Sequence, residues 1–113
     1  MKKLNRVHLS GLRSVEAVGR LGSLAAAADE LGVTAGAISQ QVHRTEEALG
    51  RALFSRKGKG LRLTPLGAEI CAGLTAGMTE LSRAVALAEQ RSQRGLTVSA
   101  APIFASRWLV WRL

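Results

Sequence analysis

The sequence is poor in cysteine, aromatic residues and acidic residues. Of its 113 residues one is Cys, none is Tyr, and 8 are Asp or Glu against 16 Lys and Arg. A single Cys excludes an internal disulfide framework and is typical of a reducing compartment. Aromatic residues make up 4% of the chain, which argues against single-strand binding through many stacked rings. The formal charge of +8 favours a polyanionic partner.

Long apolar runs are also missing. The longest stretches without formal charge, Leu31 to His43 and Gly95 to Ser106, are too short to span a bilayer. The charged start is not followed by the apolar run of a signal peptide. A hydrophobic fraction of 47% nevertheless supplies enough apolar surface for one compact domain with some attachment. The composition therefore predicts a small, soluble, basic protein of the cytoplasm, with no membrane contact.

Apolar spacing predicts three helices in the first half of the chain. Within 4–19, steps of three give one helical stripe that ends at the glycines 19 and 22; its members are Leu9, Leu12, Val15 and Val18. Ser23 is a good N-cap for a helix over 24–31, and Thr34 for a helix over 35–49. Gly32 and Gly50 are placed to end them. The tight turn at 31–34 indicates a helix-turn-helix; any three-helix bundle is the alternative.

A basic β-hairpin is predicted next. Short alternating runs at 53–56 and 61–63 flank a Gly-containing loop at 57–60. Five basic residues and no acid fall within twelve residues: Arg51, Arg56, Lys57, Lys59 and Arg62. Directly after a helix-turn-helix, we interpret the hairpin as a wing that reaches DNA phosphates. A charged edge that serves only solubility is the alternative.

Thr64-Pro65 predicts the start of a long helix that runs to about residue 94. Its near-heptad apolar seam favours packing against the same helix of a second subunit. The predicted dimerisation residues are Ile70, Leu74, Met78, Leu81, Val85 and Ala88. Residues 95–113 are interpreted as the truncated start of another domain, in which Trp108 and Trp111 need a covering surface. The expected divisions are therefore 1–63, 64–94 and 95–113.

Ordered motifs in this sequence resemble the LysR-type transcriptional regulators. Residues 22–31 match the family's G-S-x-x-x-A-A-x-x-L segment, and residues 33–42 resemble its recognition helix, with Ser39 and Gln41 at hallmark positions. Glu46, Leu49-Gly50, Leu53-Phe54, Arg56, Leu63-Thr64 and Gly67 complete the signature E-x-x-L-G-x-x-L-F-x-R … L-T-x-x-G. The match covers residues 4 to about 94. The tail, 96–113, is similar to the start of the effector domain in the branch that regulates glycine-cleavage and β-lactamase genes.

The resemblance implies a mainly α fold: a winged helix-turn-helix with a two-stranded β wing, then a long linker and dimerisation helix. It implies a bacterial-type regulator that binds an interrupted palindrome in double-stranded DNA as a homodimer, with a tetramer possible in a full-length form. The small-molecule effector site would lie outside this chain. A truncated interfering subunit, or a winged-helix module that binds protein and not DNA, remains the alternative.

The expected DNA contacts form two groups. The face of the 35–49 helix opposite Ile38, Val42 and Leu49 is predicted to read bases in the major groove through Ala35, Gly36, Ser39 and Gln40. Phosphate and wing contacts are predicted for Ser23, Thr34, His43, Arg44, Arg56, Lys57, Lys59 and Arg62.

The sequence departs from the family pattern at three positions. Thr45 stands where Leu is usual, which should weaken packing under the recognition helix. Gly36 lowers helix propensity by up to about 1 kcal/mol relative to Ala, and Gln40 replaces a common basic residue. No enzyme, metal or cofactor is expected, because His8, His43 and Cys71 lie on separate elements without metal-ligand spacing. No glycine-rich phosphate loop occurs either.

Overall fold

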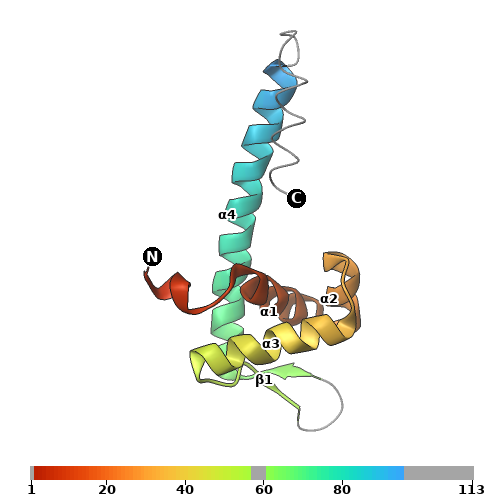
Figure 1. The fold of residues 1–113 in the computed structure, drawn as a ribbon, viewed down its shortest axis with the longest axis vertical. Helices are drawn as coiled ribbons and strands as arrows, with labels where there is room; N and C mark the ends of the chain where they lie inside the picture. Colours follow the sequence, from red (N-terminus) through yellow and green to blue (C-terminus); the bar gives the residue numbers. More distant parts are fainter. Residues whose placement is uncertain (1, 57–60, 96–113) are drawn as a thin grey trace. The chain divides into compact units, whose positions relative to one another are not determined.

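The computed structural model describes residues 2–56 and 61–95. In chain order the elements are the 3₁₀ helix η1 (Lys2–Arg6), helices α1 (Leu9–Leu21), α2 (Leu24–Leu31) and α3 (Ala35–Leu49), strands β1 (Phe54–Ser55) and β2 (Arg62–Leu63), and helix α4 (Pro65–Gly95). Figure 1 shows α3 crossing α1, with the hairpin next to α3. The mainly helical winged fold predicted from the sequence is confirmed.

The chain divides into two compact units, Met1–Met78 and Thr79–Leu113. The first unit contains the three short helices, the hairpin and the first turns of α4. Of the second unit, the structure describes the remaining turns of α4, up to Gly95. The predictions for Lys57, Lys59 and the tail with Trp108 and Trp111 fall outside the described residues.

Hydroxyl side chains start three of the helices, as predicted. The Ser23 oxygen accepts a hydrogen bond from the backbone N–H of Ala26 at 3.0 Å, and the Thr34 oxygen accepts from that of Ala37 at 3.1 Å. At α4 the Thr64 oxygen accepts from the N–H of the third residue on at 3.0 Å. Each bond satisfies a donor that the first turn of a helix leaves without an intrahelical partner.

Left-handed glycines end the short helices. Gly22, Gly32 and Gly50 have φ values of 78°, 69° and 70°, a region that residues with a Cβ rarely adopt. The bounds of α2 and α3 agree with the prediction, whereas α1 begins at Leu9 and continues through Gly19 to Leu21. Gly19 is therefore an interior helical residue, and Gly22 is the left-handed residue that ends α1.

The hydrophobic core lies where α1, α2 and α3 meet. Its most buried members, with at most 2% of their surface exposed, are Val15, Ala17, Val18, Ala27, Ile38, Val42 and Leu53. Phe54 at the base of the wing and Cys71 of α4 complete the cluster. The core therefore joins the wing and the first turns of α4 to the three short helices.

Thr45 is buried in the interface between α3 and α1, with 4% of its surface exposed. Its hydroxyl donates to the backbone carbonyl of Gln41 at 2.8 Å, so the buried polar group is satisfied. Gly11 of α1 lies directly opposite, and a Cβ added there would collide with the Thr45 hydroxyl. Because Gly11 has no side chain and Thr45 has a short one, α1 and α3 approach each other closely at this point.

A buried carboxylate ties three helices together. Glu16 of α1 accepts hydrogen bonds from Arg20 at 2.8 and 3.2 Å and from the Thr75 hydroxyl of α4 at 2.8 Å. Arg20 also pairs with Glu30 of α2. The hydrogen bonds from Arg20 hold the pKa of Glu16 below its usual value, with a further contribution from Thr75, although burial alone would raise it.

The wing is a short antiparallel hairpin. Phe54 pairs with Leu63, and Ser55 with Arg62. The strands are two residues each, shorter than the predicted runs.

The predicted seam of α4 has two different surroundings. Ile70 and Leu74 are half-buried and pack against the core of their own chain, which the sequence-based expectation of a purely intersubunit role did not include. Met78 is half-buried; Leu81 is 55% exposed, Val85 41%, and Ala88 is exposed. Within the described residues, no helix is long and apolar enough to cross a membrane.

Candidate nucleic-acid interface

Helix α3 turns a polar, exposed face away from the core. Ala35, Gly36 and Gln40 are exposed and Ser39 is half-buried, whereas Ile38 on the opposite face is 1% exposed. All four residues expected to read bases therefore lie off the packed face. Side chains on this face can reach base edges, because a major groove admits an α-helix.

The same face carries a side-chain contact between a histidine and a glutamate that the sequence reasoning missed. His43 Nε2 lies 2.8 Å from Glu47 Oε1, and both side chains are about two-thirds exposed, at 67% and 66%. The i, i+4 spacing of the two residues was the signal that could have indicated it, because residues four apart are neighbours on a helix surface. Glu47 places a negative charge near the predicted phosphate contact His43, so that histidine already has a partner in the free protein.

A second carboxylate fixes the wing to α3. Glu46 Oε2 accepts from the backbone N–H of Leu53 at 2.7 Å and from that of Phe54 at 3.2 Å. The Thr64 hydroxyl donates to the Ala52 carbonyl at 3.0 Å on the other side of the hairpin base. The sequence indicated Glu46 only as a motif residue, because nothing local shows which backbone groups its carboxylate reaches.

The described part of the wing presents two arginines to solvent. Arg56 follows β1 directly, and Arg62 lies in β2; both are exposed. The remaining phosphate candidates are spread over the helices: Thr34, His43 and Arg44 are exposed, and Ser23 is half-buried at the start of α2. The cap bonds of Ser23 and Thr34 use a hydroxyl lone pair, which leaves each hydroxyl hydrogen able to donate.

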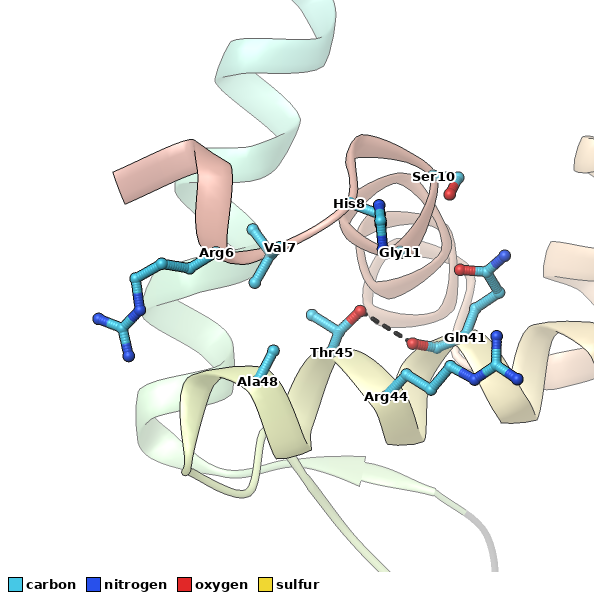
Figure 2. A pocket seen from close by; sticks show the side chains of 9 residues that line it. All are labelled: Arg6, Val7, His8, Ser10, Gly11, Gln41, Arg44, Thr45 and Ala48. Atoms are coloured by element: carbon cyan, nitrogen blue, oxygen red, sulfur yellow. Dashed lines mark hydrogen bonds between the residues drawn. The ribbon is translucent and has the colours of Figure 1, made fainter. Parts of the chain in front are cut away.

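A solvent-accessible cavity of about 480 Å³ lies between the start of α1 and the side of α3. Figure 2 shows Gln41 and Thr45 directed from α3 toward α1 across it. The residues that line it are Arg6, Val7, His8, Ser10, Gly11, Gln41, Arg44, Thr45 and Ala48. Apart from Arg44, none of these was singled out as a DNA contact from the sequence.

The described residues contain no group of three His, Cys, Asp or Glu side chains that could hold a metal ion. Cys71 belongs to the core, where its thiol contacts the Val15 carbonyl at 3.7 Å. Burial, together with the nearby charge of Glu16, raises the pKa of this thiol.

A helix-turn-helix with an exposed polar face on α3 and an arginine-bearing wing defines the class of winged helix-turn-helix domains. Residues 9–68 match the family model for the bacterial regulatory helix-turn-helix protein, lysR family. The chain belongs to the LysR family.

The relatives include the branch indicated by the sequence. The chain is 40% identical over 106 residues to the glycine cleavage system transcriptional activator of Escherichia coli, covering 93% of this chain and 35% of that protein. It is 36% identical over 109 residues to the carbapenem-hydrolyzing beta-lactamase transcriptional activator of Enterobacter cloacae, covering 96% and 37%. The chain thus spans little more than a third of the length of the curated relatives it matches.

The fold is similar to that of a solved DNA complex. The crystal structure of the BenM DNA-binding domain with catB site 1 DNA aligns with a TM-score of 0.67 at 26% identity, covering 74% of this chain and 93% of that one.

Proposed function

We propose that this chain is the DNA-binding part of a cytoplasmic transcriptional regulator, with α3 in the major groove of double-stranded DNA and the wing on its phosphates. The observation that carries the proposal is the outward face of α3, held to an arginine-bearing wing by the two hydrogen bonds of Glu46. Family membership and the similarity to a DNA complex support it.

Residues near the start of α3 read bases in this arrangement. The Ala35 methyl contacts a thymine methyl, the Ser39 hydroxyl donates or accepts, and the Gln40 amide pairs with N6 and N7 of adenine. Gly36 lets the DNA approach the backbone of α3 closely on the same face, since nothing in the chain lies within 4 Å of the position its Cβ would take.

Phosphate contacts surround the base-reading face. Helix starts at Ser23 and Thr34 offer backbone N–H groups and hydroxyls to phosphate. The other contacts come from basic side chains of α3 and of the wing, namely His43, Arg44, Arg56, Lys57, Lys59 and Arg62.

The exposed part of α4 serves dimerisation in this proposal. Leu81 and Val85 are large apolar side chains left 55% and 41% exposed, and Met78 and Ala88 continue their seam. A second copy of the helix would cover them and present two recognition helices to an interrupted palindrome. Ile70 and Leu74 would extend the seam from the edge of the core. Residues 1–63 are then the reading domain and 64–94 the linker.

The first test is a salt titration of Arg56→Ala on random-sequence duplex DNA. Each phosphate contact contributes about 0.9 to the slope of log affinity against log salt, so we expect the slope to become shallower by about that amount per subunit and affinity to fall on every sequence. Arg13→Ala is the matched control. Gly11 faces α3, and Arg13 lies about 200° further round α1, so this arginine points away from α3. Absence of any binding to duplex DNA at low salt would indicate the protein-interaction module instead.

The second test measures base readout. Duplexes selected from a random pool are compared with scrambled versions for the wild type and for Gln40→Ala. A good bidentate contact gives about 1–3 kcal/mol of discrimination, so the preference of the variant should fall roughly 5- to 150-fold, while affinity for scrambled DNA changes little. Equal losses on both duplexes would contradict direct readout by Gln40.

A further inference from the structure

We propose that Arg6 and Arg44 form a second phosphate-binding region, on the side of α3 opposite the wing. The inference rests on the proposed function and adds to it a contact from the N-terminal segment. The ligand is the sugar-phosphate strand that borders the major groove on the α1 side of the recognition helix.

The cavity between η1, the start of α1 and α3 has the chemistry of an anion site. Arg6 and Arg44 line it together with His8, and none of its nine lining residues is acidic. The polar groups of Ser10 and Gln41 add neutral hydrogen-bonding capacity. A surface of this composition, in a protein of formal charge +8, favours an anion.

Both guanidinium groups are free to bind a ligand. Arg6 and Arg44 are exposed, and neither forms an ion pair with any carboxylate in residues 2–56 or 61–95. Arg20 shows the contrast, because two carboxylates already hold its guanidinium group. An unpaired arginine binds phosphate without first giving up an internal partner.

Arg44 lies on the side of α3 that faces away from the wing. Glu46 marks the wing side of the helix, because its carboxylate binds the wing backbone. At about 100° per residue, Gln40 lies about 120° from Glu46, and Arg44 about 40° beyond Gln40. Ser39 lies within about 20° of Glu46, so the base-reading face extends from the wing side of the helix to Gln40, and Arg44 lies beyond its other edge. A helix in the major groove has a phosphate strand on each side, and the wing serves one of them.

The arrangement of the two arginines favours a strand over a single ion. Figure 2 shows Arg6 and Arg44 at opposite ends of the cavity, with their guanidinium groups directed outward and not toward a common point. Guanidinium groups directed away from each other suit successive phosphates along a strand better than one shared ion. The shared chemistry is phosphate, and the test separates the strand from the free ion.

The experiment measures the affinity of the full chain for a selected duplex over a series of chloride concentrations. Arg6→Gln and Arg44→Gln are compared with Arg13→Gln, which removes the same charge from the far side of α1, and with Arg56→Ala in the wing. Arg6→Gln and Arg44→Gln should each make the salt slope shallower by about 0.9 for every phosphate that the variant no longer binds and weaken binding on selected and scrambled duplexes equally. The slope for Arg13→Gln should equal that of the wild type. Circular dichroism confirms that each variant is folded.

A second arm identifies the strand. Neutral methylphosphonate linkages are introduced one at a time along the duplex. A linkage that weakens wild-type binding but leaves Arg6→Gln binding unchanged identifies the phosphate that Arg6 binds, because the variant makes no interaction there for the neutral linkage to remove.

Three results would overturn the inference. The first is an unchanged salt slope for Arg6→Gln and Arg44→Gln while Arg56→Ala still lowers it; this outcome leaves the proposed function intact. The second is a methylphosphonate scan in which no linkage distinguishes wild type from Arg6→Gln. The third is saturable binding of inorganic phosphate by the DNA-free protein, abolished in Arg6→Gln, with an unchanged DNA salt slope, which would assign the cavity to a free anion. Failure of the wild type to bind any duplex would reject the proposed function itself.

Discussion

The Glu46 carboxylate holds α3 to the wing, and the cost of its removal can be worked out from the structure. It accepts two hydrogen bonds, from the N–H groups of Leu53 and Phe54, residues that are 0% and 8% exposed. Glu46→Ala leaves both donors without this acceptor. A buried donor left unsatisfied costs about 1–3 kcal/mol, and water can partly reach a half-buried site. We therefore expect the free energy of unfolding to fall by about 2–4 kcal/mol.

Urea denaturation followed by circular dichroism measures this loss, and the next residue supplies the control. Glu47→Ala removes the same charge from α3, but the Glu47 carboxylate is 66% exposed and its partner is the equally exposed His43. Exposed pairs contribute about 0.2–1 kcal/mol. Glu46→Gln should recover part of the loss, since the amide oxygen still accepts a hydrogen bond. A loss for Glu46→Ala no larger than that for Glu47→Ala would refute the reasoning.

The same substitution has a consequence for DNA binding. Arg56 follows Phe54 by two residues, so releasing the hairpin base also releases the arginine. In a double-mutant cycle, Arg56→Ala should weaken DNA binding less in the Glu46→Ala background than in the wild type. Strict additivity would mean that the wing keeps its position without the carboxylate.

Two further predictions concern stability. A Cβ at Gly67 would collide with the backbone carbonyl of Leu53, whereas nothing lies within 4 Å of one at Gly73; in urea denaturation Gly67→Ala should destabilise by about 1–3 kcal/mol and Gly73→Ala should stabilise by up to about 1 kcal/mol, and shifts of the same sign would contradict the packing. Because Arg20 holds the pKa of Glu16 below its usual 4.5, the stabilisation by the Glu16 carboxylate is complete above that pH and is lost as pH falls through the lowered value. The difference in unfolding free energy between wild type and Glu16→Gln should therefore be constant near neutrality and shrink on acidification, and a difference independent of pH would exclude this role.

Local signals in the sequence predicted the helix-turn-helix. Ser23 and Thr34 as caps, with Gly32 and Gly50 as stops, fixed the bounds of α2 and α3 because each signal acts within one turn of the helix end. The sequence offers two stops for α1, Gly19 and Gly22, and local signals do not distinguish them. Gly19 is needed for another reason: a Cβ there would lie 2.5 Å from the sulfur of α4's cysteine, a contact between distant parts of the chain.

The outward direction of the α3 face predicted to read bases followed from helical periodicity, which requires only one element. What sequence reasoning missed depends on where separate elements meet. The reach of Glu46 to the hairpin backbone, the cavity beside Arg44 and the packing of Ile70 and Leu74 on their own core each join two or more elements. The spacing of residues within one segment cannot predict which other segment they contact.

The alkylation rate of the single cysteine can report local opening between α4 and α1. Cys71 is 5% exposed, and burial raises its pKa, so the reactive thiolate is scarce while α4 is seated on α1. Alkylation at neutral pH will then proceed only during local openings of that joint. Since the chain has no second thiol, the labelling rate reports this one event without an introduced probe. Comparing the labelling rate with and without DNA would reveal whether binding of the duplex reduces the opening between α4 and α1.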